Sequence, residues 1–290
     1  MMDNKYQWPQ AMAIYPDRNN KTYRLKRLRY KLRSLKSYSN IKKFEQFMNE
    51  NPDFIGLVNS HPNYSYPVVY RFLDKRFSAK QRLQMICENL TFLPNKLSEL
   101  GHDPLWEKEI NFGEVIPDFD LRLKINEFQP MEGYWNLELF YKPTEELIYL
   151  LSFGKIEQSL LIAVIQGPNQ EGSKEMVKLL TKKCHGLRPA YLMVEAMKSL
   201  TQLLGYENLQ GIPQKYQNKS RFVQSKHYAV NYDTIFSESN GVLQGYWQLP
   251  LSLENKNLDD IPSKKRSMYR KRYAMLEQLQ SSMKEKLFLS

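Results

Sequence analysis

The run Leu-Leu-Ile-Ala-Val-Ile at residues 160–165 constrains the fold more than any other stretch of this sequence. All of its side chains are apolar, so both faces of a strand formed here must be shielded from water, as they are in a central strand. A second apolar run occupies residues 147–153, and Gly154 and Lys155 predict a turn between the two. We therefore expect two adjacent strands at the centre of a mixed α/β (α+β) fold.

Closely spaced strands precede this pair. Residues 121–126 alternate apolar and polar side chains, as a half-buried strand does, and residues 134–141 form another candidate strand. The intervals between these strands are too short for helical crossovers, which predicts a largely antiparallel meander. Later in the chain, further strands are expected at residues 207–212, 230–236 and 246–249.

Two helices are expected after the central strand. A short helix covers residues 173–183, and a long helix runs from Pro189 to the stop signal Gly205. Proline suits a first helical turn because the N–H that it lacks would be unpaired there anyway. The long helix has one broad apolar side, and its polar side carries Glu195, Lys198, Ser199 and Gln202.

The residues before the long helix form a candidate anion site. A helix start offers free N–H groups and the positive end of the dipole, and Arg188 adds guanidinium donors, with His185 close by in the chain. The alternative interpretation is a polar turn with an ordinary surface pair. His227 and Asp233 likewise suggest either an acid/base pair or ordinary polar surface.

The first 100 residues are predicted to be mainly helical, and residues 101–290 to form the α/β domain. This boundary rests on composition, because no glycine- or serine-rich linker marks it. Residues 70–93 are expected to form a helical pair, in which Ser78 caps the second helix.

Residues 21–36 contain eight basic residues and no acidic one. Leucines recur here at spacings of three, four and three, which places them in one stripe on a helix whose other faces are cationic. The stripe leucines are Leu25, Leu28, Leu32 and Leu35.

This basic helix has three interpretations. Its stripe docks on its own domain, or the helix binds an anionic membrane, or it neutralises residues 99–127, where eight acidic residues face three basic ones. Nucleic acid is disfavoured as a partner, because an arm that binds phosphates needs no leucine stripe.

A last helix is predicted to start at Ser263, as its N-cap, with an apolar face of methionines and Leu279. Its first turn carries Lys264, Lys265 and Arg266, where the helix dipole is already positive. Either the neighbouring acidic residues or a bound phosphate offsets this charge. The three cations therefore join His185 and Arg188 as candidate anion-binding residues.

Composition and motifs disfavour several classes of protein. The chain is 42% hydrophobic and 25% charged, which is typical of a folded protein. No apolar run approaches the ~20 residues that span a bilayer, and the N-terminus lacks a signal-peptide core, so a cytoplasmic location is expected. Cys87 and Cys184 form no metal motif, and metalloprotease, P-loop and α/β-hydrolase signatures are missing. We expect no metal site.

Four stretches together resemble the VirK/YbjX family of Gram-negative bacteria. They are His-Gly-Leu-Arg-Pro at residues 185–189, the turn at Gly211, Tyr-Trp-Gln-Leu-Pro at residues 246–250 and the basic, tyrosine-containing run at residues 264–273. The resemblance implies a role in virulence and the cell envelope, including surface-protein display and antimicrobial-peptide resistance, and supplies no biochemical activity. We therefore expect an accessory protein, peripheral at the inner membrane, that binds acidic lipid or an envelope protein.

The element order is also similar to the GNAT fold of acyl-CoA-dependent N-acetyltransferases. In that family the loop after the fourth strand holds a pyrophosphate through its backbone N–H groups. Here that loop contributes Gln166, Gly172 and Ser173, but the Gly-x-Gly/Ala spacing is absent and Pro168 removes one donor. The alternative function is therefore an acyltransferase that uses acyl-CoA on an envelope precursor or a protein amine.

Overall fold

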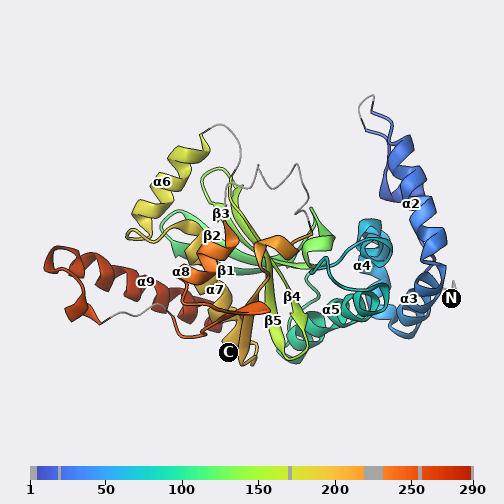
Figure 1. The fold of residues 1–290 in the computed structure, drawn as a ribbon. Coiled ribbons are helices and arrows are strands. Elements are labelled where there is room, and N and C mark those ends of the chain that lie inside the picture. The colour runs from blue at the N-terminus through green and yellow to red at the C-terminus, as the bar shows by residue number, and fades with distance from the viewer. Residues whose placement is uncertain (1–4, 19–20, 169–171, 219–230, 254–256, 289–290) are drawn as a thin grey trace.

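The centre of the protein is an eight-stranded sheet with the strand order β1-β2-β3-β4-β5-β6-β8-β7 (Figure 1). The computed structural model describes residues 5–18, 21–168, 172–218, 231–253 and 257–288. The strands are β1 (Ile110–Ile116), β2 (Phe119–Ile125), β3 (Trp135–Tyr141), β4 (Glu146–Ile156), β5 (Ser159–Gln166), β6 (Asn208–Gly211), β7 (Val242–Gln244) and β8 (Tyr246–Leu249). The mixed α/β class expected from the sequence is confirmed.

Strands β2 to β5 form the predicted antiparallel meander, β1 extends it by one strand that was not predicted, and β5 then pairs in parallel with β6. Each residue of β5 before Gln166 is buried, so the prediction of a central strand covered on both sides is confirmed. The turn expected at Gly154 and Lys155 is wrong, because β4 continues to Ile156. Gly154 instead lies where α5 crosses the sheet, since a Cβ atom there would come within 2.5 Å of the Asn89 side chain.

Helices cover the sheet and form the N-terminal region. Before the sheet come α1 (Ala11–Ile14), α2 (Arg24–Lys36), α3 (Tyr38–Glu50), α4 (Ile55–Ser60) and α5 (Ala79–Glu99); the later helices are α6 (Ser173–Lys183), α7 (Pro189–Leu203), α8 (Tyr232–Glu238) and α9 (Ser263–Leu287). Helix α7 packs against β4, β5 and β6, and α9 packs against α7 and β1. Helix α6 has the bounds expected from the sequence, and the mainly helical N-terminal region is confirmed. The domain boundary near residue 100 stays a prediction.

Helix α5 shows how a local signal fixes an element. Ser78 accepts a hydrogen bond from the Gln81 N–H, and the Gln81 side chain accepts one from the Ser78 N–H, so the predicted cap is confirmed. The helix passes Pro94 and ends at Glu99, later than expected. The predicted helix before Ser78 is wrong, because residues 70–77 form bends, turns and an isolated bridge.

The strand predicted at residues 230–236 is also wrong in its described part, which forms α8. The Asn231 side chain accepts a hydrogen bond from the Thr234 N–H and caps this helix. The Tyr232 hydroxyl donates to the Ile165 carbonyl of β5 (2.7 Å), which anchors the helix to the sheet. Tyr232, Ile235 and Phe236, the buried residues of α8, therefore lie on one face of a helix.

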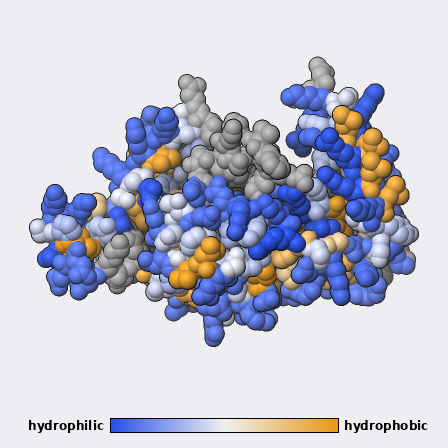
Figure 2. Space-filling model, in the orientation of Figure 1, coloured by the Kyte–Doolittle hydropathy of each residue, from blue (hydrophilic) through white to orange (hydrophobic). Residues whose placement is uncertain are grey.

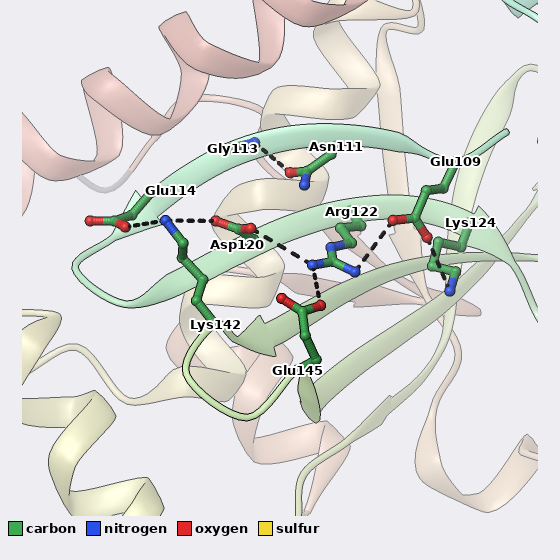
Figure 3. A network of polar contacts seen from close by, with 9 residues as sticks. All are labelled: Glu109, Asn111, Gly113, Glu114, Asp120, Arg122, Lys124, Lys142 and Glu145. Atoms are coloured by element: carbon green, nitrogen blue, oxygen red, sulfur yellow. Dashed lines mark hydrogen bonds and ion pairs between the residues drawn. The ribbon is translucent and has the colours of Figure 1, made fainter.

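Three acids of the segment at residues 99–127, Glu109, Glu114 and Asp120, form ion pairs within the sheet, and among the described residues no acid of this segment pairs with the basic helix. Arg122 pairs with Glu109 (3.3 Å), Asp120 (3.7 Å) and Glu145 (2.7 Å) on one side of β1–β3, as Figure 3 shows. Lys124 also pairs with Glu109, and Lys142 pairs with Glu114. Helix α2 lies at the edge of the molecule, away from the central strands β1–β3 (Figure 1). The interpretation of α2 as an internal counter-charge is therefore wrong.

Candidate functional site

The predicted cofactor loop begins at the end of β5. The Gln166 side chain donates a hydrogen bond to the carboxylate of buried Glu132 (3.0 Å). Gly172, in the left-handed region with φ 82°, precedes α6, and Ser173 is the first residue of that helix. Residues 169–171 lie outside the described part of the chain. The acyl-CoA role of these residues therefore stays a prediction.

The His-Gly-Leu-Arg-Pro run is a tight connection between α6 and α7. His185 and Gly186 both have positive φ, and the Gly186 N–H donates to the Thr181 carbonyl (2.8 Å), which closes the last turn of α6. Arg272 of α9 donates from Nη2 to the His185 carbonyl (3.1 Å). Burial, with Lys271 and Arg272 nearby, lowers the pKa of His185, so its ring is neutral at pH 7 and adds no charge for an anion.

Arg188 already has an anionic partner. Its guanidinium pairs with Glu238, donates to the Tyr191 hydroxyl (2.8 Å) and stacks over the Tyr191 ring at 4.5 Å. The Arg188 side chain is 62% exposed. The surface-pair interpretation therefore describes this residue better than an open anion site does.

We expect Arg188→Ala to change the free energy of unfolding by no more than about 0.5 kcal/mol, because the side chain is exposed. Urea unfolding followed by circular dichroism measures this. Arg272→Ala is the matched comparison: Arg272 is 6% exposed, binds the His185 carbonyl and stacks over Tyr269, so its loss should destabilise the protein more. Equal effects of the two substitutions would contradict this assignment.

A polar cavity of about 350 Å³ lies between α7, the end of α8 and α9. Its most buried members are Glu195 and Lys198, whose carboxylate and ammonium are 2.8 Å apart. Lys198 Nζ also contacts the Ser252 carbonyl (3.3 Å). Sequence reasoning placed this pair on the polar side of α7 but missed its burial. The cavity is lined by Gly186, Leu187, Arg188, Tyr191, Glu195, Lys198, Glu238, Ser239, Asn240, Tyr269 and Arg272.

The first turn of α9 does not join this cavity. Ser263 is its first helical residue and not its N-cap. Arg266 donates to the carbonyls of Ile261 (2.9 Å) and Asp259 (3.2 Å), so its guanidinium closes the preceding turn. Lys264 and Lys265 are exposed and line none of the cavities described here. Helix α9 therefore reaches the His185 run through Arg272, and anion binding at its first turn stays a prediction.

The remaining candidates have structural surroundings. Asp233 accepts hydrogen bonds from Trp247 Nε1 (2.8 Å) and the Gln214 N–H (3.1 Å), while His227 lies outside the described residues. Burial raises the pKa of Cys87 and of Cys184 to about 12, so both thiols are protonated. Among the described residues, no three His, Cys, Asp or Glu side chains are grouped to hold a metal ion.

Helix α2 turns its leucine stripe toward solvent. Leu25, Leu28, Leu32 and Leu35 are 70%, 52%, 58% and 74% exposed, while Tyr30 on the opposite side is 2% exposed. Figure 2 shows this apolar stripe on the surface over α2. The interpretation that the stripe docks on its own domain is therefore wrong. The buried contact of α2 is made by its aromatic side, where Tyr30 stacks on Trp8.

The cations of α2 divide between two faces. At about 100° per residue, Arg24 and Lys31 lie along one side of the stripe, and Arg29 and Lys36 along the other. These four are exposed, and none forms an ion pair with a described residue. The other three cations lie away from the stripe: Arg27 pairs with Asp17, Arg33 donates to the Tyr66 hydroxyl, and Lys26 lies over the Tyr23 ring. The stripe is thus bordered on both sides by unpaired positive charge.

Comparison with known proteins finds relatives that match this chain over different shares of its length. It is 63% identical over 284 residues to an uncharacterized protein of Haemophilus influenzae, covering 98% of this chain and 97% of that protein. It is 65% identical over 219 residues to "Membrane protein LapB" of Mannheimia haemolytica, covering 76% and 96%. Uncharacterized protein YbjX of Escherichia coli is 28% identical over 150 residues, covering 49% and 44%. No solved structure matches the chain, so its similarity to the GNAT fold stays a prediction.

Within the described residues, none of the helices has the length and apolar character needed to cross a bilayer. The family described as "Protein of unknown function (DUF535)" matches residues 19–285, which is nearly the whole chain. The predicted resemblance to VirK/YbjX is confirmed, and the chain belongs to the DUF535 family, which includes YbjX.

Proposed function

We propose that this protein is a peripheral accessory protein of the bacterial envelope that binds an anionic membrane surface through α2. The observation that carries the proposal is the exposed leucine stripe, bordered by four cations that form no ion pair with a described residue. Amphipathic helices that lie in a membrane interface have this arrangement, with apolar side chains in the acyl region and Lys or Arg at the headgroups. A nucleic-acid surface would leave the leucines in water.

The magnitudes favour a lipid partner. Burying a whole leucine side chain is worth about 1.5–3 kcal/mol, and the four stripe leucines are 52–74% exposed. Their transfer into the acyl region therefore contributes about 4–7 kcal/mol before the cost of association. Each cation near an anionic leaflet adds about 1 kcal/mol. The two contributions are similar in size, so binding should need both the apolar stripe and anionic lipid.

The names of similar proteins also support a function at a membrane. A relative from Mannheimia haemolytica carries the name "Membrane protein LapB". The VirK/YbjX resemblance implies support of envelope homeostasis and virulence, and a protein docked on the inner leaflet is in a position to contribute to both. The acyltransferase stays the alternative function; among the described residues of its predicted loop, the Gln166 side chain is hydrogen-bonded to Glu132.

The test is flotation of the full chain with vesicles of phosphatidylglycerol and phosphatidylethanolamine. We expect binding that falls with added salt, because the Debye length is about 8 Å at physiological ionic strength. Neutralising Arg24 and Lys31 together (Arg24→Gln, Lys31→Gln) should weaken binding by about 2 kcal/mol, or roughly 30-fold.

A matched control removes the same charge from the inward side of the helix. Lys26 lies over the Tyr23 ring (4.6 Å) and Arg27 is paired with Asp17, so Lys26→Gln with Arg27→Gln should weaken vesicle binding less. Wild-type protein that stays unbound in the presence of anionic vesicles would refute the proposed function.

A further inference from the structure

An apolar groove runs beside the stripe, between α1, α2 and α3. Its volume is about 770 Å³. The buried side chains Ala11, Tyr30 and Ile41 line it, and the exposed side chains Met12 (51%) and Tyr38 (61%) lie at its edge. An open apolar groove of this size between surface helices suggests a ligand with a hydrocarbon body.

The groove has a fixed wall. The Trp8 ring is parallel to Tyr30 at 6.1 Å between centroids, and Trp8 Nε1 lies 3.4 Å from the Ser34 hydroxyl. The Trp8 backbone N–H donates to the Glu45 carboxylate (3.0 Å), and the Tyr30 hydroxyl donates to the Pro9 carbonyl (2.8 Å). These contacts fix the chain before α1 against α2 and α3, so the groove is formed before any ligand enters.

The charges at the groove favour an anionic head on that hydrocarbon. Three cations, Arg27, Lys31 and Lys42, line it against one acid, Glu45. Lys42 is bound to Glu45 (2.8 Å) and Arg27 to Asp17, whereas Lys31 has no ion-pair partner among the described residues. Lys31 therefore keeps its charge available at the rim.

The groove is also continuous with the proposed membrane face. Leu35 belongs to the stripe and lines the groove, and Lys31 lies between the two. A lipid at the membrane surface therefore needs only a short displacement to place one chain between Trp8 and Tyr38.

We propose that this groove holds one acyl chain of an anionic amphiphile, whose phosphate or carboxylate head is bound by Lys31. The inference deepens the proposed function, on which it rests for the class of ligand. Stripe and groove then have different tasks: the stripe contacts the bilayer, and the groove accommodates a single chain.

Trp8 gives a direct test. Delipidated full-length protein is titrated with 9,10-dibromostearate below its critical micelle concentration, and tryptophan fluorescence is recorded, since bromine quenches an indole that it contacts. We expect saturable quenching with one molecule bound, and loss of that quenching in Trp8→Phe. Met12→Glu with Tyr38→Glu, which places carboxylates at exposed positions of the groove, should weaken binding at least tenfold. No saturable quenching in the wild type, or unchanged quenching in Met12→Glu, Tyr38→Glu, would overturn the proposal.

Two further experiments are needed. The first identifies whether the acyl chain comes from a bilayer or from a free amphiphile, and the second tests the groove separately from the stripe. Vesicles of dibrominated phosphatidylglycerol are mixed with the protein and then removed: protein that stays quenched has taken its chain from the bilayer, whereas quenching by the monomer alone identifies a free amphiphile. Leu28→Ser with Leu32→Ser leaves the groove lining intact and should still be quenched by the monomer. Loss of vesicle binding with retained quenching in this variant would show that the stripe and the groove act separately. A wild type that is quenched by the monomer but does not bind vesicles would refute the proposed function and leave the groove proposal standing.

Discussion

Replacing Leu28 and Leu32 with serine should reduce binding to anionic vesicles by roughly 30- to 150-fold. The two side chains are 52% and 58% exposed, so their removal forfeits about 2–3 kcal/mol of transfer into the acyl region. Serine adds a hydroxyl that must stay hydrated at the interface. Neither leucine belongs to the hydrophobic core of the described residues, so the midpoint of urea unfolding should stay close to that of the wild type. Flotation over a range of lipid concentrations measures the binding change.

Strand β7 offers a matched control at another surface. Val242 and Leu243 are 58% and 50% exposed, nearly the same as the α2 pair, and they belong to the strand that ends the sheet. Val242→Ser with Leu243→Ser removes a similar exposed apolar area and leaves α2 unchanged. We expect this variant to bind vesicles like the wild type. Equal loss in both variants would mean that general surface hydrophobicity drives adsorption, and α2 would lose its assigned role.

Periodicity predicted α2 as a helix with a leucine stripe, but it could not predict which side of the helix faces the protein. The spacing of three and four says only that the leucines share a face. The direction is decided by partners distant in the chain: Trp8 and Tyr66 stack on Tyr30 and hold the aromatic side inward. Apolar content alone favoured burial of the leucines, and the structure shows the reverse.

The sheet was predictable because its signals are local. A short all-apolar run bounded by turn signals favours a covered strand, and short intervals between strands favour antiparallel neighbours, so β2 to β5 could be predicted from the sequence. The candidate site was less predictable from the sequence. The sequence placed Arg188 at a helix start, but its partner Glu238 lies 50 residues later on α8, where a strand was predicted at residues 230–236. Only tertiary contacts reveal that Arg188 is already paired.

The buried pair of α7 should make Glu195 one of the most sensitive polar positions in the protein. Glu195 and Lys198 are 2.8 Å apart with side chains 5% and 2% exposed. Glu195→Leu leaves the Lys198 ammonium buried with the Ser252 carbonyl, 3.3 Å away, as its remaining contact among the described residues. An uncompensated buried charge typically costs about 3–5 kcal/mol, so urea unfolding should show a loss of this size.

Two further variants test whether the stability loss in Glu195→Leu comes from the unpaired charge or from altered packing. Adding Lys198→Met to Glu195→Leu removes the stranded ammonium and should recover most of the lost stability, because buried ion pairs exchange well for apolar residues of similar volume. Glu99→Leu breaks another pair at the same i,i+3 spacing, but there Lys96 and Glu99 are 38% and 66% exposed, so its effect should stay below about 1 kcal/mol. If Glu195→Leu cost no more than Glu99→Leu, the ammonium would have to reach water in the folded protein. The polar cavity around Arg272 would then be hydrated as far as Lys198.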